Sequence, residues 1–306
     1  MTKKERLDTE RRVFDIYSGI LVNHLEFRPG PSASPVYDLD CPEYGTLREK
    51  YALDKLAGKG GAFQRAKRLL HHFAPRLTHL SNYDNHVPCD ALSLLEYSYE
   101  RPDQGINCLN KAKILAECCL AVGIHARRMG IMPYSPYDND NHVVIEIYDP
   151  GLGKWIMLDP STDGYFVDEA GAPLSVLEIR ERFARRQFAA FVTSTERKND
   201  LRKLWDRHMG LNTYFCKNLF WLRIERYNGF GSRGEWLSFV PADYDLKQNR
   251  IAQVEYRLTL LPEAGLSPEE TRQWEEEDRR WLEKVKAAPE DACYDLAVLT
   301  APPQER

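Results

Sequence analysis

Two β-rich runs that flank a proline–glycine turn constrain the fold of this 306-residue chain more than any other feature. The runs are His142–Tyr148 and Lys154–Asp159, and residues 149–153, Asp-Pro-Gly-Leu-Gly, lie between them. Valine, isoleucine, tyrosine and tryptophan favour strands, whereas aspartate, proline and glycine favour turns. The sequence therefore predicts an antiparallel β-hairpin.

The register of this hairpin decides which side chains share a face. If Lys154 pairs with Ile147, then His142 lies directly opposite Asp159. Directly opposed residues have Cβ atoms about 5 Å apart, so the hairpin would present an imidazole backed by a carboxylate. On the other face the same register predicts an apolar set that could pack on a helix, with Val143 opposite Leu158 and Ile145 opposite Ile156.

A cysteine begins the helix that the sequence predicts upstream of the hairpin. In residues 105–124, Asn107 is a favoured N-cap, and apolar residues follow it at spacings of three and four. Cys108 falls in the first turn, where unpaired N–H groups and the helix dipole stabilise an anion. We expect this thiol to ionise more readily than a free cysteine. A base and its orienting carboxylate, such as His142 and Asp159, would activate it as a nucleophile.

The segment from about Leu92 to Tyr165 resembles the catalytic core of the transglutaminase-like superfamily. Four motifs occur in the family's order: Asn107-Cys108, Gly123-Ile124-His125-Ala126-Arg127, His142-Val143-Val144, and Trp155 through Asp159-Pro160. The resemblance implies a papain-like α+β fold, in which the helix that bears the cysteine packs on an antiparallel sheet, with a C-terminal β and helical extension. It also implies Cys108 as nucleophile, His142 as general base and acid, and Asp159 as the residue that orients His142.

This resemblance implies acyl transfer or hydrolysis at an amide bond through a thioester on Cys108. Water as the acceptor would make the protein a cysteine protease or amidase, and an amine would make it a transglutaminase-type acyltransferase. The implied partner is a peptide or protein amide, and no cofactor or calcium is implied. The alternative is a catalytically silent scaffold that binds peptides or a protein partner. The presence of all three residues favours the enzyme.

The other site candidates are predicted from their positions. Gln104 and Asn107 could donate to an oxyanion, although a turn glutamine and an N-cap asparagine also have structural explanations. Tyr134, Tyr137 and Tyr165 flank the predicted site in sequence and could line a substrate groove.

A metal site is not indicated. Histidines occur at positions 71, 72, 79 and 86, but their spacing does not match H-E-x-x-H and no paired cysteines accompany them. We expect them on a solvated helix face. The run 138–141 lacks the glycine and glutamate of a calcium loop, so we expect it to form the turn that delivers His142. Arg127 and Arg128 could bind a substrate carboxylate, although the first resembles a structural arginine of the family.

Composition excludes several classes of protein. A net charge of −4 with interspersed signs gives no basic patch for nucleic acids or acidic membranes. The charged residues 1–12 lack the apolar region of a signal peptide, and no run approaches the roughly 18 apolar residues of a membrane span. The seven cysteines include no C-x-x-C pair, which favours the reduced state. These features predict a cytoplasmic protein.

The order of the predicted elements indicates three segments. Residues 1–88 form a mostly helical N-terminal layer, residues 89–190 form the catalytic core, and residues 191–306 form a C-terminal β and helical elaboration. With 43% hydrophobic residues the chain can build one large core, so we expect the elaboration to belong to the same globular unit.

The C-terminal segment carries three further predictions. Residues 212–240 look β-like, and a second half-buried strand is predicted from an apolar alternation that comprises Val254, Tyr256, Leu258 and Leu260. A helix is predicted to begin after Ser267, with Pro268 at its first position and Glu270 completing a capping box. We expect this helix to dock on its own domain.

Overall fold

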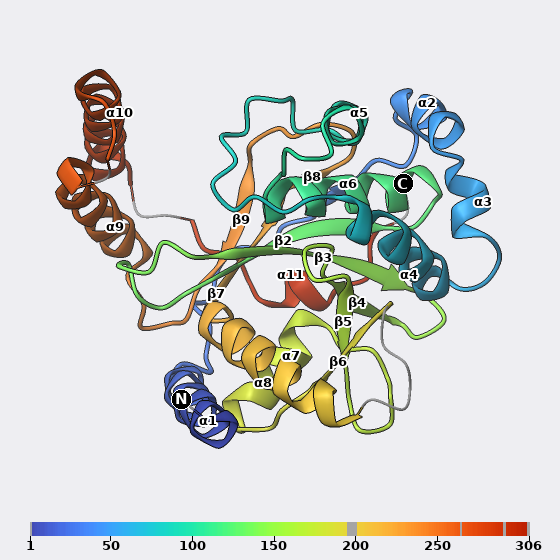
Figure 1. Cartoon of the computed structure of the whole chain (residues 1–306), viewed down its shortest axis with the longest axis horizontal. Coiled ribbons are helices and arrows are strands. Elements are labelled where there is room, and N and C mark those ends of the chain that lie inside the picture. The colour runs from blue at the N-terminus through green and yellow to red at the C-terminus, as the bar shows by residue number, and fades with distance from the viewer. Residues whose placement is uncertain (1, 195–200, 264, 290–291, 305–306) are drawn as a thin grey trace.

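The computed structural model describes residues 2–194, 201–263, 265–289 and 292–304. At its centre is a five-stranded antiparallel sheet with the strand order β4-β3-β2-β7-β9 (Figure 1). Its strands are β2 (Ala126–Met132), β3 (His142–Asp149), β4 (Lys154–Leu158), β7 (Trp221–Glu225) and β9 (Trp236–Phe239). Two short pairs lie outside it, β1 (Val36–Tyr37) with β8 (Tyr227–Asn228) and β5 (Gly164–Val167) with β6 (Ala190–Thr193). The predicted α+β class is confirmed.

Helices cover both faces of the sheet (Figure 1). One face carries α2 (Glu43–Lys50), α3 (Leu53–Ala57), α4 (Ala62–Phe73), α5 (Ala91–Glu100) and α6 (Cys108–Ala121). The other carries α1 (Lys3–Asn23), α7 (Val176–Ala184) and α8 (Leu201–Asn218). The remaining helices are α9 (Leu246–Leu260), α10 (Pro268–Ala287) and α11 (Ala297–Thr300). None of the helices in the described residues is both long enough and apolar enough to cross a membrane.

The sheet separates two hydrophobic cores, and strand β3 contributes to both. Val143, Ile145 and Ile147 join the core beneath α2–α6, whereas Val144 joins the core beneath α1, α7 and α8. This division follows from the period of two in a strand, which sends successive side chains to opposite faces. The apolar face predicted for the hairpin therefore packs on the helix that bears Cys108.

The hairpin forms as predicted, but its predicted register is wrong by two residues. Ile147 pairs with Ile156, and Asp149 remains in β3 opposite Lys154. The turn therefore has four residues, 150–153. It is stabilised by the Asp149 carboxylate, which accepts hydrogen bonds from the N–H groups of Gly151 and Leu152. A shift of two keeps every side chain on its predicted face, whereas a shift of one would have reversed them all.

Two predicted β segments are helical. Residues 212–218 belong to α8, and residues 254–260 belong to α9, so these two predictions are wrong. In α9 the inward residues are Ile251, Val254 and Leu258, which pack on α10 at helical spacing. Strand alternation and helical spacing both fit this run, so the pattern alone did not distinguish them. The strands expected around Leu222 and Trp236 do form, as β7 and β9.

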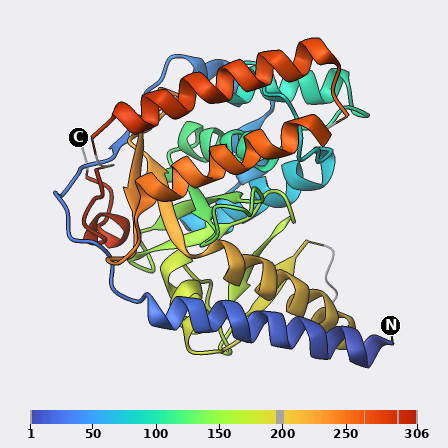
Figure 2. The same cartoon turned by 90° about the vertical axis from the view of Figure 1, so that its left-hand side faces the viewer.

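Helices α9 and α10 pack side by side at one end of the molecule (Figure 2). The predicted start of α10 is confirmed, since Ser267 is the N-cap, Pro268 is the first residue and Glu270 completes the capping box. The Arg257 guanidinium donates to the Asp278 carboxylate between the two helices. We call residues 246–287 the helical arm.

Candidate active site

Cys108 is the first residue of α6, as predicted. The Asn107 side chain caps the helix, with its Oδ1 accepting a hydrogen bond of 3.2 Å from the Asn110 N–H. The first helical backbone bond runs from the Lys111 N–H to the Asn107 carbonyl, so the N–H groups of Cys108 and Leu109 precede it. The half-buried Cys108 thiol therefore lies beside two N–H groups that have no acceptor within the helix.

His142 and Asp159 are in direct contact. The His142 Nε2–H donates to Asp159 Oδ2 at 3.0 Å, with 4% of His142 and none of Asp159 exposed. Asp159 Oδ2 also accepts from the Thr162 hydroxyl at 2.6 Å, and its Oδ1 accepts from the Ser161 N–H at 2.8 Å. A carboxylate held by three donors is fixed in place. Because Nε2 is occupied, Nδ1 is the His142 nitrogen that remains for Cys108, whose sulfur lies near enough to raise the pKa of His142.

This contact shifts both pKa values in the sense that favours charge. Burial alone would lower the pKa of His142, but the Asp159 carboxylate and then the Cys108 sulfur outweigh it and raise this pKa from 6.5 to about 10. Burial alone would raise the pKa of Asp159, but His142, the Thr162 hydroxyl and the Ser161 N–H outweigh it and lower this pKa. The imidazole is therefore protonated at neutral pH and the carboxylate is ionised.

Cys108 and His142 line one cleft of about 680 Å³, which we call the catalytic cleft. Most of the residues that line it are of polar types, and besides these two they are His79, Ser81, Asn82, Asn107, Leu109, Asn139, Asp140, Asn141, Val143, Ser161, Thr162, Tyr214 and Arg223. These residues come from the loops before α5 and α6, from the two ends of the hairpin, and from α8 and β7. The cleft thus combines residues from all three segments of the chain.

Helix α8 packs against His142 with aromatic rings. The ring centroids of Tyr214 and Phe215 lie 5.5 and 5.6 Å from that of His142. Lys217, one turn further on, forms 2.9 Å ion pairs with Asp138 and Asp140, which holds the loop that leads into β3. These contacts were missed because the sequence around residue 214 was interpreted as a strand.

The structure places Gln104 outside the residues that line the cleft, with its side-chain oxygen accepting from the Tyr97 hydroxyl at 2.9 Å. Asn107 does line the cleft, but its amide nitrogen donates to Asn85 Oδ1 at 3.1 Å while its oxygen caps α6. Neither amide is therefore directed at an oxyanion.

The three tyrosines proposed as substrate contacts lie away from the cleft lining. Tyr134 packs on Phe220, and Tyr137 stacks edge-on against Tyr256 of the helical arm. Tyr165 is buried in the core beneath α2–α6. Proximity in sequence was a poor guide here, because Tyr134 and Tyr137 lie in the connection between β2 and β3 and Tyr165 lies on β5, outside the cleft lining.

The basic residues that follow α6 serve the core. Arg127 is paired with Glu146 and stacks on Trp155, and Arg128 is paired with Glu225. Both guanidinium groups are buried, so neither is available to a substrate.

The predicted histidine surface is only partly observed. His71 and His72 are in the last turn of α4, but His71 Nδ1 bonds Asp163 at 2.8 Å. His79 lies beyond the helix, in the cleft, where burial, Lys111 and His142 lower its pKa. Within the described ranges, no three histidine, cysteine or acidic side chains gather as a metal site.

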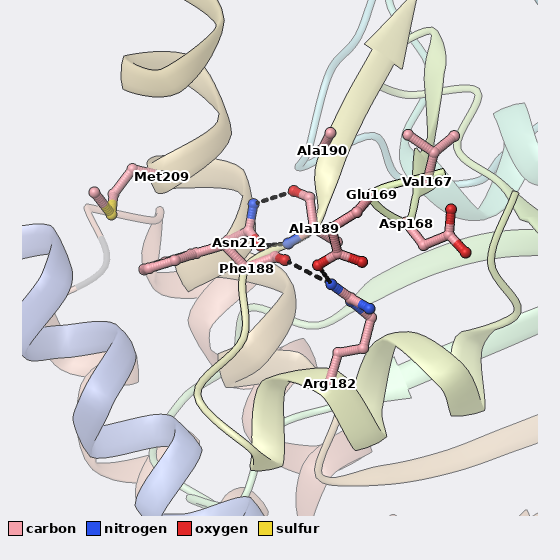
Figure 3. Close-up of a pocket in the computed structure, with 9 residues that line it drawn as sticks. All are labelled: Val167, Asp168, Glu169, Arg182, Phe188, Ala189, Ala190, Met209 and Asn212. Carbon is pink, nitrogen blue, oxygen red and sulfur yellow. Dashed lines mark hydrogen bonds and ion pairs between the residues drawn. The ribbon is translucent and has the colours of Figure 1, made fainter. Parts of the chain in front are cut away.

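A second cavity, of about 190 Å³, lies beside α7 and α8 (Figure 3). The Asn212 amide bonds both backbone groups of Ala189, and Arg182 donates to Glu169 and to the Phe188 carbonyl. The described residues that line it include no cysteine, serine or histidine. Its polar groups serve the fold, so the catalytic cleft is the candidate active site.

Comparison with known proteins supports this choice. Residues 49–160 match the model of the transglutaminase-like superfamily, which includes cysteine-dependent enzymes. This match contains Cys108, His142 and Asp159 and ends just after the hairpin. The chain matched no curated protein and no solved structure.

Proposed function

Because residues 49–160 match the model of the transglutaminase-like superfamily, we propose that the protein is a thiol enzyme that hydrolyses an amide bond through a thioester on Cys108. The observation that carries the proposal is the buried His142–Asp159 pair, whose imidazole lines the same accessible cleft as Cys108. A base that is oriented by a carboxylate and shares a cleft with a thiol can serve nucleophilic catalysis.

In this mechanism Cys108 is a thiolate and His142 carries the proton. The thiolate attacks the amide carbonyl, and the N–H groups of Cys108 and Leu109 donate to the oxyanion that forms. Each such donor contributes roughly 3 kcal/mol to the transition state. His142 then protonates the leaving amine as the carbon–nitrogen bond breaks, which leaves a thioester. His142 then takes a proton from water, which attacks the thioester; the carbon–sulfur bond breaks, the acid leaves, and the Cys108 thiolate and protonated His142 are restored.

The lining of the cleft favours water over an amine as the acceptor. Hydroxyl, amide and charged side chains are present in the lining around Cys108, and their polar groups can hold water next to a thioester. An enzyme that transfers acyl groups to amines must exclude water from the intermediate. Glycine ethyl ester, added as a competing amine, should therefore leave free acid as the main product in a mass-spectrometric assay of peptide amides.

The first test is the alkylation of Cys108 by iodoacetamide at pH 6. A free thiol is only about 0.3% ionised at this pH, whereas a thiolate paired with His142 would react roughly 100-fold faster. The His142→Ala variant should lose this advantage. Cys89 is the other half-buried cysteine, so its labelling in the same peptide map serves as the internal control.

The outcome separates the enzyme from a silent scaffold. Selective labelling of Cys108 that disappears in His142→Ala supports the enzyme. Labelling of Cys108 and Cys89 at equal rates would contradict it, and the cleft would then be a binding site without a nucleophile.

A further inference from the structure

The Arg223 guanidinium has no acidic hydrogen-bond or ion-pair partner within the part of the chain that the structure describes. Among the described residues, no hydrogen bond or ion pair joins its side chain to another, and its Nε is buried with no acceptor. The guanidinium stacks on Trp236, with 4.6 Å between its central carbon and the ring centroid. Arg223 as a whole is half-buried and only its Nε is enclosed. Holding a charge partly away from water without a counterion is costly, so an anion that binds there would stabilise it.

The neighbouring cations differ from Arg223 in this respect. Arg128 is paired with Glu225, and Lys217 is paired with Asp138 and Asp140. Asp138, which lines the adjoining cavity together with Arg223, is therefore already engaged. The nearest carboxylates are thus paired with Arg128 and Lys217. Of these three cations, Arg223 is the one that lines the cleft without an ion pair.

The sheet is shaped to direct Arg223 toward the catalytic cleft. Arg223 lies opposite Gly130 on β2, and Gly130 lies opposite Val143, which lines the cleft. A Cβ at Gly130 would come within 2.9 Å of the Arg223 Cγ and Nε atoms. The glycine thus leaves room for the arginine side chain to cross β2 on the face that packs on α6.

The neighbouring positive charges favour the binding of an anion next to Arg223. Burial, followed by repulsion from Arg250 and Arg128, lowers its pKa to about 10, although Glu225 acts in the opposite sense. At neutral pH the group remains charged, and a bound oxyanion would relieve the repulsion. A guanidinium presents a planar fork that matches the two oxygens of a carboxylate.

We propose that Arg223 binds a carboxylate of the substrate, so that the amide cleaved at Cys108 carries a free carboxylate near the scissile bond. This inference rests on the proposed function and specifies its substrate class. In a peptide the group would be a C-terminal carboxylate or an aspartate or glutamate side chain. Arg223 would then determine specificity by placing the carbonyl over the Cys108 sulfur.

Two matched reagents test this directly. N-Bromoacetylglycine and its carboxamide alkylate a thiolate by the same step, in which a carbon–sulfur bond forms and bromide leaves. They differ only in the charge at the far end. The measured quantity is the rate ratio of acid to amide at Cys108, divided by the same ratio at Cys89 in the same sample.

In the unmodified protein this ratio should be about ten, the gain from one charge-assisted pair. Arg223→Gln should reduce it to about one, and Arg223→Lys should retain part of it, because lysine keeps the charge without the fork. Arg233→Gln is the control, since Arg233 stacks on Tyr227 outside the cleft lining and its loss should leave the ratio unchanged.

The outcomes distinguish this inference from the proposed function. A ratio near one in the unmodified protein, with Cys108 still labelled rapidly by both reagents, would overturn the role of Arg223 alone. Slow labelling of Cys108 by both reagents would overturn the thiol enzyme and this inference with it. Because the unmodified protein decides the matter, a variant that fails to fold leaves the test intact.

Discussion

At the scale of single residues, the site depends on a carboxylate that is completely enclosed. Asp159 has no exposed surface, and three donors occupy its two oxygens. Such a group cannot turn away from His142 without losing hydrogen bonds that water is unable to replace. The orientation of the imidazole is therefore set by the turn that follows β4.

Replacing Asp159 by asparagine removes the charge but keeps the shape. We expect Asp159→Asn to lower the free energy of unfolding at neutral pH by about 3 kcal/mol, because His142 loses the partner of a buried pair. Urea unfolding measures this. The control is Asp163→Asn, the same change four residues away, where the carboxylate accepts from the less buried His71.

The difference in unfolding free energy between the unmodified protein and Asp159→Asn should depend on pH. The pKa of His142 is raised from 6.5 to about 10, so its contribution is complete below pH 6.5 and disappears as pH rises through about 10. The pKa of Asp159 is lowered, so its contribution is present above pH 3.8 and is lost as pH falls below that value. Unfolding energies of the two proteins should therefore converge at both extremes. A constant gap from pH 6 to pH 10 would contradict the pairing.

At the scale of elements, the sequence predicted those parts of the site that local patterns determine. Asn107 marked the start of α6, and the hairpin placed His142 and Asp159 on one face even though its turn is shorter than expected. Tyr214 and Arg223 were missed, because their positions depend on packing between segments distant in sequence. No local pattern reports that β7 pairs with β2 or that α8 covers His142.

The cap of α6 is an element that can be tested by itself. Asn107→Ala should cost about 1 kcal/mol of stability and slow the alkylation of Cys108, because the first turn holds the thiol beside its N–H groups. Ser267→Ala removes an equivalent cap from α10, far along the chain, and should cost a similar amount without affecting Cys108. Equal slowing in both variants would mean that global stability, rather than the first turn, controls the thiol.

At the scale of the whole molecule, the chain consists of a sheet with two large cores and a helical arm with a small one. The small core of the arm comprises Ile251, Val254 and Leu282, supported by Leu258 and Val285, whereas Leu246 at its start joins a large core. The arm also lines the cavity next to the catalytic cleft, through Arg250 and Trp281 among others. So small a core gives the arm little stability of its own.

Truncating the arm's core should therefore act locally. Leu282→Ala is expected to accelerate amide hydrogen exchange in α9 and α10 while leaving β2 and β3 protected. Leu158→Ala, in a large core, should cost about 3 kcal/mol and accelerate exchange throughout the sheet. Faster exchange in the sheet of Leu282→Ala would show that the arm and the sheet unfold as one unit.

The position of β7 in the sheet has a consequence for the synthesis of the protein. Strand β2 lies between β3, which follows it closely, and β7, which begins at Trp221. During translation, β7 is synthesised about 90 residues after β2, which takes roughly 5–20 s. Until then β2 lacks its second partner strand. Meanwhile its open edge can pair with other chains, and an excised fragment ending near residue 160 would retain this edge permanently. A chain whose synthesis stops between Asp159 and β7 would be prone to aggregate, with all three residues of the proposed catalytic set already made.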